Sequence, residues 1–351
     1  MAQEITVCII AKNEEKYIRT CMEALKPFDV ETVVVDTGSQ DKTKDIAKEY
    51  TNLVYDFEWI GDFAAARNFA AGKASHNYIV AVDCDEFIEK FDIKGICTFL
   101  KKNPDKAGRL LVHSYVAGTS GISMSDSYVL RIYDKRFVEF RNRIHEQLMR
   151  KDNKAIEYSD LNASVVHMGY MLTAEEKIEK NNRNIELLLL QAKENPDDCY
   201  TYYQLGLSYD VIGEVDKAYE ARKKAMSLNP PKEAEYTRML LAGFAKSALA
   251  AGDYKAAVRI EDYYEFAKTS ADYMFHLGQV YFANGDFEKA LDSFELATKC
   301  KECQIVGTNS FFPYNAIALL LDKIGEVEEA EKYRAMAEEA VRKTYNIKPK
   351  V

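Results

Sequence analysis

Long apolar runs are missing from this chain of 351 residues. No stretch approaches the roughly 20 consecutive apolar residues that a membrane-spanning helix needs. The first residues, Met1 to Glu4, carry neither the basic segment nor the apolar core of a signal peptide. We therefore expect a cytoplasmic protein without a membrane span.

Cysteine pairs and an excess of positive charge are missing too. The seven cysteines are odd in number and scattered, which is typical of reduced thiols. Cys300 and Cys303 form one Cys-x-x-Cys pair without a second, which argues against a zinc site. With 47 basic and 56 acidic residues the formal net charge is −9. Sequence-independent binding to nucleic acid needs a basic face, so we expect no nucleic-acid partner.

Two common nucleotide-binding motifs are also absent. No Gly-x-Gly-x-x-Gly follows the first predicted strand, which disfavours a dinucleotide cofactor. The Walker A motif is missing as well, which removes the usual ATPase interpretation.

The composition, 47% hydrophobic and 29% charged, is that of an ordinary globular protein, and the length predicts roughly two domains.

The amino-terminal half alternates strands with helices. Apolar runs predict strands at residues 4–11, 31–36, 53–57 and 78–82. Helical patterns lie between them, at residues 14–26, 41–50 and 62–74, and Asp41 is expected to cap the second helix. Strands separated by such helices form right-handed β-α-β units and a parallel sheet. We therefore predict an α/β domain with a mostly parallel, Rossmann-like sheet over residues 1–170.

Polar residues follow three of these strands. They are Lys12-Asn13-Glu14, Asp36-Thr37-Gly38-Ser39 and Asp83-Cys84-Asp85. The carboxyl ends of parallel strands meet at one edge of a sheet, where α/β proteins bind ligands. We expect a nucleotide to bind at this edge.

The acidic stretch after the fourth strand is the most informative of the three. Asp83, Asp85 and Glu86 have no Lys or Arg beside them in the sequence. On extended backbone Asp83 and Asp85 would point the same way. Carboxylates placed like this suit a hard divalent cation that also binds a diphosphate. The alternative is a solvated acidic turn.

From about residue 171 the chain is predicted to be helical and repetitive. Gly213, Gly252, Gly285 and Gly325 begin similar segments, each with an alanine shortly after the turn. The pattern resembles the helix–turn–helix unit of about 34 residues in tetratricopeptide repeats. Longer links are expected near residues 230–231 and 300–312, and a helix at 327–345 is expected to cap the stack. We therefore predict an all-α repeat solenoid over residues 171–351.

The amino-terminal motifs together resemble the family 2 glycosyltransferases with the GT-A fold. The resemblance covers roughly residues 4–170 and rests on residues 9–14, 34–43, 62–68 and 83–86. The repeat tail and the link at residues 177–184 resemble those of a subgroup of these transferases. The resemblance implies a nucleoside-diphosphate sugar as donor.

It also implies a Mn²⁺ or Mg²⁺ ion on the diphosphate. Asp85 is the expected direct ligand, and Asp83 is expected on the ribose or on a metal-bound water. His167, after a predicted strand at 163–166, resembles the late metal ligand of many GT-A enzymes. The alternative for His167 is an ordinary histidine at a domain boundary.

For the nucleotide, the resemblance implies that Asp36 receives the base through the uracil imide N–H. Arg67 would hold Asp36 ionised or touch the nucleotide directly. Ala11 and Asn13 are expected to meet the base or ribose through backbone groups. For Glu14 we favour the ordinary role of an acid in the first turn of a helix.

Inverting transfer needs a base that takes a proton from the acceptor. The His145-Glu146 pair within residues 141–148 resembles the His-Glu segment of related transferases. This implies Glu146 as the base, with His145 orienting it or contacting the diphosphate. The alternatives are Glu86 as the base, and a salt bridge from Glu146 to Arg141 or Arg143.

These interpretations combine into an inverting glycosyltransferase that uses a UDP-hexose or UDP-N-acetylhexosamine. Repeat arrays commonly bind extended chains, so we expect a peptide or protein acceptor on the repeat domain. A homo-oligomer is left open. The alternatives are a transferase of cell-surface polysaccharide or lipid-linked glycan assembly, and a catalytically inactive repeat scaffold for protein interaction.

Overall fold

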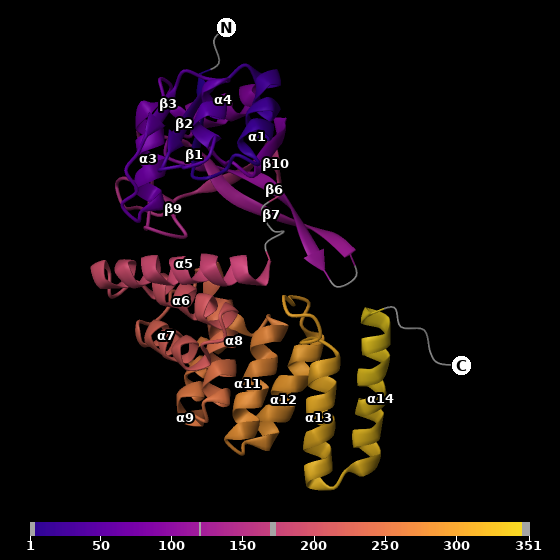
Figure 1. Cartoon of the computed structure of the whole chain (residues 1–351). Coiled ribbons are helices and arrows are strands. Elements are labelled where there is room, and N and C mark those ends of the chain that lie inside the picture. Colours follow the sequence, from indigo (N-terminus) through magenta and orange to yellow (C-terminus); the bar gives the residue numbers. More distant parts are fainter. Residues whose placement is uncertain (1–3, 119–120, 169–172, 346–351) are drawn as a thin grey trace. The chain divides into compact units, whose positions relative to one another are not determined.

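The structure is a computed structural model and describes residues 4–118, 121–168 and 173–345. The chain divides into two compact units, Met1–Leu187 and Leu188–Val351. The predicted boundary between residues 170 and 171 lies outside the described residues and stays a prediction. Figure 1 labels many of the elements of both units.

The first unit is built on an eight-stranded sheet with the order β3-β2-β1-β4-β7-β6-β10-β5. Its strands are β1 (Ile5–Ala11), β2 (Glu31–Asp36), β3 (Val54–Asp56), β4 (Tyr78–Asp83), β5 (Glu86–Phe91), β6 (Ala107–Gly118), β7 (Gly121–Asp134) and β10 (Tyr158–His167). Strands β3, β2, β1 and β4 pair in parallel, and so do β6 and β10. β8 (Val138–Arg141) and β9 (Gln147–Arg150) form a separate two-stranded sheet. The mostly parallel α/β fold is confirmed.

The central strands β1, β2 and β4 are buried on both faces because they are apolar almost throughout. Along β1, the side chains of Ile5, Val7 and Ile9 join one core cluster, whereas Cys8 joins the cluster on the other side. The helices of this unit are α1 (Ile18–Leu25), α2 (Thr43–Lys48), α3 (Phe63–Lys73) and α4 (Ile93–Lys102), with a short 3-10 turn at Lys26–Phe28. Continuous apolar strands of this kind are typical of a sheet covered by helices.

Two predicted helix starts are wrong. α1 begins at Ile18, so Glu14 lies in the preceding turn and not in a first helical turn. α2 begins at Thr43 with Lys42 at the N-cap, and the Asp41 carboxylate instead accepts from the backbone of Thr43 and Glu15. The start of α3 is confirmed, because the Asp62 side chain accepts from the Ala65 N–H at 2.8 Å.

The second unit is helical, and α5 (Ala174–Glu194) runs into it from the first. Its further helices are α6 (Cys199–Val211), α7 (Val215–Ser227), α8 (Glu235–Ala250), α9 (Tyr254–Ala257), α10 (Tyr264–Ala267), α11 (Ala271–Ala283), α12 (Phe287–Lys299), α13 (Phe311–Ile324) and α14 (Val327–Thr344). A 3-10 stretch at Val258–Tyr263 separates α9 from α10, so the helix after Gly252 is broken. None of the described helices is long and apolar enough to span a membrane.

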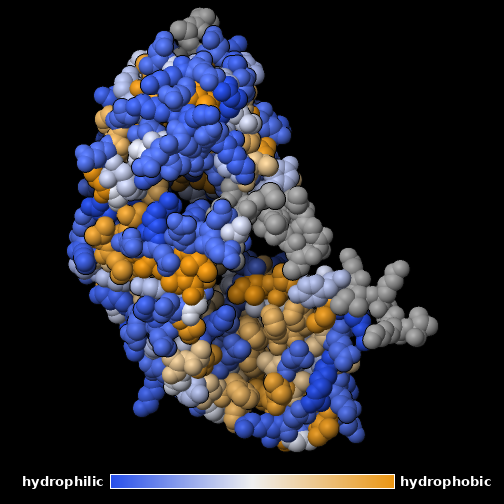
Figure 2. Space-filling model, in the orientation of Figure 1, coloured by the Kyte–Doolittle hydropathy of each residue, from blue (hydrophilic) through white to orange (hydrophobic). Residues whose placement is uncertain are grey.

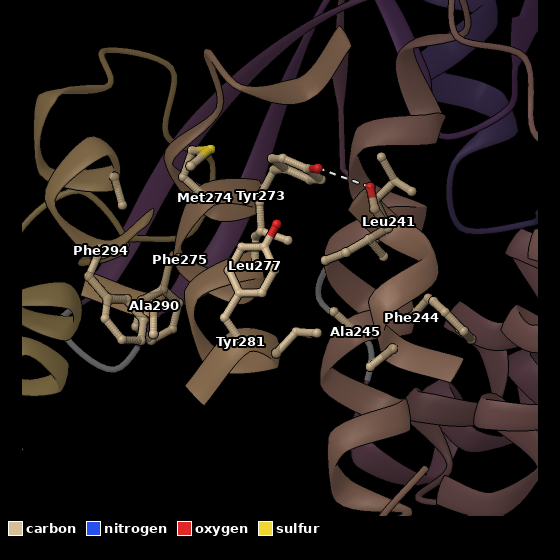
Figure 3. Packing of buried hydrophobic residues seen from close by; sticks show 14 of the residues in the cluster. Leu241, Phe244, Ala245, Tyr273, Met274, Phe275, Leu277, Tyr281, Ala290 and Phe294 are labelled. Atoms are coloured by element: carbon tan, nitrogen blue, oxygen red, sulfur yellow. Dashed lines mark hydrogen bonds between the residues drawn. The ribbon is translucent and has the colours of Figure 1, made fainter. Parts of the chain in front are cut away.

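The four predicted turn glycines all adopt a positive φ, between 72° and 88°. This backbone conformation costs glycine little and other residues more. Alanines after the turns, among them Ala218, Ala257 and Ala290, are fully or almost fully buried where adjacent helices meet. Figure 3 shows the cluster that α8, α11 and α12 form around Phe244, Leu277 and Phe294.

Candidate active site

The ends of β1, β2 and β4 lie next to one another at one edge of the sheet. Ala11 pairs with Asp36 in the register of β1 with β2, and Ile10 pairs with Asp83 in the register of β1 with β4. The edge borders a pocket of about 550 Å³. Of the predicted site residues, those that line it are Ala11, Arg67, Asp83, Asp85, Glu86, His145, Glu146 and His167.

Asp36 is held by the turn that follows its own strand. One carboxylate oxygen, Oδ2, accepts from the backbone N–H groups of Gly38 at 3.1 Å and Ser39 at 3.0 Å. The other oxygen, Oδ1, is buried and has no hydrogen-bond partner within the described part of the chain. Arg67 does not contact Asp36, so that part of the prediction is wrong. Asp36 therefore keeps one buried acceptor beside the strand ends.

Asn13 connects the loops that follow β1 and β2. Its backbone N–H donates to Ser39 Oγ at 2.9 Å, and its side-chain oxygen accepts from the Gln40 N–H at 2.8 Å. The residue adopts φ 55°, a left-handed conformation that asparagine tolerates. Glu14 follows it and lines the pocket, where burial raises the pKa of its carboxyl to about 7.

Arg67 lies on α3 and pairs with two carboxylates. Its Nε donates to Glu146 Oε1 at 2.6 Å, and its Nη2 donates to Asp83 Oδ1 at 2.7 Å. Alanines at positions 64, 66, 70 and 71 are buried and let α3 pack closely on the sheet, which brings the guanidinium to the strand ends. Burial by itself would lower the pKa of Arg67, but the charges of Asp83 and Glu146 raise it.

The second oxygen of Asp83 is taken by Arg131, which sequence reasoning missed. Arg131 lies on β7, and its Nη2 donates to Asp83 Oδ2 at 2.8 Å and lies 3.6 Å from Glu86 Oε1. Burial opposes ionisation of Asp83, but the charges of Arg131 and Arg67 hold its pKa well below the usual value. A clue was present, since Arg131 is a lone charge between Leu130 and Ile132 and such a residue needs a carboxylate partner when buried.

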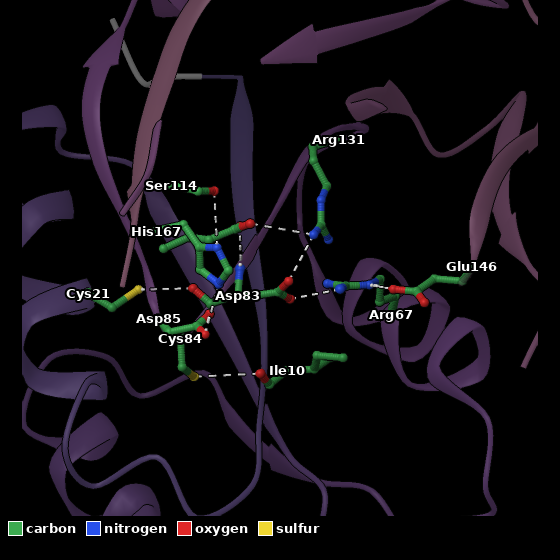
Figure 4. Close-up of polar contacts among 11 residues, drawn as sticks. Ile10, Cys21, Arg67, Asp83, Cys84, Asp85, Ser114, Arg131, Glu146 and His167 are labelled. Atoms are coloured by element: carbon green, nitrogen blue, oxygen red, sulfur yellow. Dashed lines mark hydrogen bonds and ion pairs between the residues drawn. The ribbon is translucent and has the colours of Figure 1, made fainter. Parts of the chain in front are cut away.

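Asp83 and Asp85 do not point the same way, because the chain turns between β4 and β5 instead of staying extended. Asp85 Oδ2 lies 3.1 Å from His167 Nε2, across 82 positions of sequence. Figure 4 shows Asp85 directed toward His167 and Asp83 directed toward the arginines. Burial would lower the pKa of His167, but the hydrogen bond and charge of Asp85 raise it.

The predicted metal ligands come together only in part. Asp85 and His167 are adjacent, but no cluster of three or more potential His, Cys, Asp or Glu ligands exists among residues 4–118, 121–168 and 173–345. The pair nevertheless fits a divalent cation bound with a nucleotide. Such ions are commonly held by one or two protein ligands and complete their coordination with substrate phosphates and water.

Glu86 is the first residue of β5 and is only 5% exposed. Its Oε2 accepts from the Asp83 N–H at 2.9 Å, and burial raises the pKa of its carboxyl. His145 adopts φ 51° and has a buried Nε2 without a partner within the described ranges. Burial lowers the pKa of His145, which favours its neutral form.

Comparison with known proteins agrees with this architecture. Residues 6–160 match the family model described as "Glycosyl transferase family 2", and residues 271–301 match a tetratricopeptide repeat model. The chain is 26% identical to the SPbeta prophage-derived glycosyltransferase SunS of Bacillus subtilis over 64% of this chain and 53% of that protein. It is 26% identical to a TPR repeat-containing protein of Synechococcus elongatus, over 67% of this chain and 59% of that protein.

The chain thus spans little more than half the length of these two curated relatives. Among solved structures, a crystal structure of MamA matches with a TM-score of 0.41 and 23% identity, over 50% of this chain and 99% of that chain. The predicted family is confirmed for these ranges: residues 6–160 form a family 2 glycosyltransferase domain, and a tetratricopeptide repeat lies at residues 271–301.

Proposed function

We propose that this protein transfers a sugar, with inversion, from a UDP-hexose or UDP-N-acetylhexosamine to a peptide or protein acceptor. The observation that carries the proposal is the pocket at the strand ends. The pocket contains a carboxylate–imidazole pair at Asp85 and a second carboxylate at Glu146. Asp36, with its unpaired buried acceptor, does not line the pocket but pairs in register with Ala11, which does.

Asp36 would recognise the base. Its free Oδ1 is an acceptor, and the uracil imide N–H is a donor of matching chemistry. The hydrogen bonds from Gly38 and Ser39 keep the carboxylate oriented without help from an arginine. Backbone groups of Ala11 and Asn13, on the adjacent strand end and loop, would contact the base or ribose.

Asp85 and His167 would hold Mn²⁺ or Mg²⁺. When bound, such an ion stabilises the charge that develops on the departing diphosphate. Both of the oxygens of Asp83 already accept hydrogen bonds from arginines, so we assign the direct ligation to Asp85 and His167. Ser114, whose Oγ lies 3.5 Å from His167 Nδ1, would help to orient the imidazole.

Glu146 would accept the proton of the acceptor nucleophile. In Figure 4 it lies at the far side of Asp83 and Arg67 from Asp85, as expected of a base opposite the leaving diphosphate. Glu86 is less suited to this role, because it is buried and its carboxylate accepts from the backbone of Asp83. A structural role at the turn explains Glu86 better.

The repeat unit would bind the acceptor. Figure 2 shows apolar side chains gathered on the face where α12 and α13 lie, and exposed apolar residues of these helices include Leu296, Phe312 and Leu319. A second pocket of about 340 Å³ lies in this unit and is lined by Tyr264, Met274 and Tyr281 among others. Surfaces of this kind favour a peptide over a free sugar.

Calorimetric titration with UDP, GDP and dTDP in the presence of Mn²⁺ tests the proposal. We expect UDP to bind most tightly, and Asp36→Asn to weaken UDP binding by about tenfold or more, because a charge-assisted hydrogen bond is lost. Slow release of UDP from the matching UDP-sugar is expected without acceptor. Equal affinity for the three nucleotides, or no effect of Asp36→Asn, would contradict the proposed donor.

A further inference from the structure

Two buried arginines share the single carboxylate of Asp83. Arg67 Nη2 donates to Oδ1 at 2.7 Å, and Arg131 Nη2 donates to Oδ2 at 2.8 Å. The arginines come from different elements, α3 and β7, and their side chains are only 6% and 12% exposed. Asp83 therefore fixes the relative orientation of two guanidinium groups.

Each guanidinium keeps a donor without a partner. Arg67 Nη1 and Arg131 Nε are both buried and make no hydrogen bond to any described residue. Both arginines line the 550 Å³ pocket. Buried N–H groups are rarely left unpaired in folded proteins, so two in one pocket point to a ligand with acceptor oxygens.

Asp83, which both arginines contact, lies between the two ends of the proposed reaction site, with Arg131 approaching it from a third side. Figure 4 shows Asp85 and His167 on one side of Asp83, and Arg67 and Glu146 on the other. The diphosphate is proposed at the first end and the acceptor nucleophile at the second. The group that passes between those ends is the transferred sugar.

We propose that Arg67 and Arg131, oriented by Asp83, bind the hydroxyl groups of the transferred sugar ring. This inference rests on the proposed function. In it Asp83 is a positioning residue, and the free N–H groups of the arginines donate to hydroxyl oxygens of the ring.

The charge of the cluster favours a neutral sugar. The two guanidinium charges are balanced by the carboxylates of Asp83 and Glu146, both within 2.8 Å of an arginine nitrogen. Glu86 adds a third carboxyl 3.6 Å from Arg131. Within this cluster the two arginines therefore carry no excess positive charge for a sugar carboxylate, so a hexose or N-acetylhexosamine should bind to them better than a hexuronic acid.

Calorimetric titration of the full chain with Mn²⁺ separates a role in binding the sugar from a role in binding the diphosphate. UDP carries the diphosphate but lacks the sugar, so only the first role affects UDP-sugars selectively. The ligands are UDP, UDP-glucose, UDP-galactose, UDP-N-acetylglucosamine and UDP-glucuronic acid. We expect Arg131→Gln to weaken the tightest neutral UDP-sugar by about tenfold or more and UDP by less than about threefold. We also expect UDP-glucuronic acid to bind the wild type more weakly than that neutral sugar.

Arg131→Lys keeps a positive charge opposite Asp83 but removes the Nε donor. It is therefore the variant to titrate if Arg131→Gln fails to fold. It should show the same selective loss. Arg109→Lys, in another strand arginine that pairs with Asp160 and does not line the pocket, should leave both affinities unchanged.

Proportional weakening of UDP and UDP-sugar would assign Arg131 to the diphosphate and overturn the inference. Unchanged affinities, or tighter binding of UDP-glucuronic acid, would also overturn it. If the wild type binds UDP-sugars but does not bind UDP itself, the proposed UDP-sugar donor is contradicted. The titration with UDP alone shows this result independently of the arginine variants.

Discussion

Arg67 Nε and Glu146 Oε1 lie 2.6 Å apart although 79 positions separate them in the sequence. Both side chains are largely buried, with 6% and 13% exposed. The predicted alternative was a salt bridge from Glu146 to Arg141 or Arg143, whereas the partner found here is Arg67. Arg141 pairs with Glu139, and Arg143 donates to the carbonyls of Ile60 and Gly61. The ion pair holds the Glu146 side chain in one orientation, as the proposed base requires.

Glu146→Gln should lower single-turnover transfer by about 10²–10⁴-fold, because glutamine keeps the size of the side chain but cannot accept the proton. UDP affinity should stay within a few-fold. Glu139→Gln, on β8 and paired with Arg141, is the matched control and should keep full transfer. If Glu146→Gln retains nearly wild-type transfer, the base is Glu86 or belongs to the acceptor.

Asp85→Asn should abolish the increase in UDP affinity that Mn²⁺ produces, since the variant loses the charge that faces the cation. Isothermal titration with Mn²⁺ and with a chelator measures the difference. The control is Asp126→Asn, which changes another Asp–His pair, with Asp126 Oδ1 2.8 Å from His113 Nδ1 and neither residue lining the pocket. Retained metal dependence in Asp85→Asn would remove Asp85 from the metal site.

Gly278→Ala should destabilise the repeat unit by about 1–3 kcal/mol. A Cβ at this position would lie 2.5 Å from the ring of Phe294, which is 2% exposed and packed in the core cluster of the repeat unit. Gly72→Ala is the control, because a Cβ on that helical glycine meets nothing within 4 Å. It should be neutral or stabilising by about 0.5–1 kcal/mol. Urea unfolding followed by circular dichroism compares them; equal effects would contradict the packing at Gly278.

The stability of the repeat unit should fall as the pH drops below about 6.5. Burial lowers the pKa of His276 below its usual value of 6.5, although its hydrogen bond to Gln279 opposes this shift. Between the folded and unfolded pKa values the unfolded chain binds more protons, so acid favours unfolding. In His276→Gln this contribution is lost.

Melting temperatures of the two proteins from pH 8 to pH 5 measure the effect. The wild type should lose more stability than His276→Gln as the pH falls through 6.5. Parallel curves for wild type and His276→Gln would show that His276 does not couple folding to pH.

Much of the fold could be predicted because its signals are local. Apolar runs such as residues 78–82 mark buried strands, and Asp62 marks the start of α3. The β6–β7 hairpin was not predicted, although its two strands follow one another and pair antiparallel. Polar residues such as His113 and Asp126 interrupt both strands, so they lack the continuous apolar runs of β1 and β4. Arg131 was missed with it, because its role depends on the pairing of β4 with β7.

The sequence by itself determined the strands β1 to β4 of the first sheet, where polar residues follow three of them, and where the repeat glycines turn the chain. These features depend on neighbouring residues and on backbone preferences, which short segments carry with them. Only the tertiary structure decided which charges meet. Asp83 faces Arg67 and Arg131, whereas Asp85 faces His167. Many carboxylates of this chain are chemically equivalent, and the register of the strands and the packing of α3 decide which of them meets which arginine or histidine.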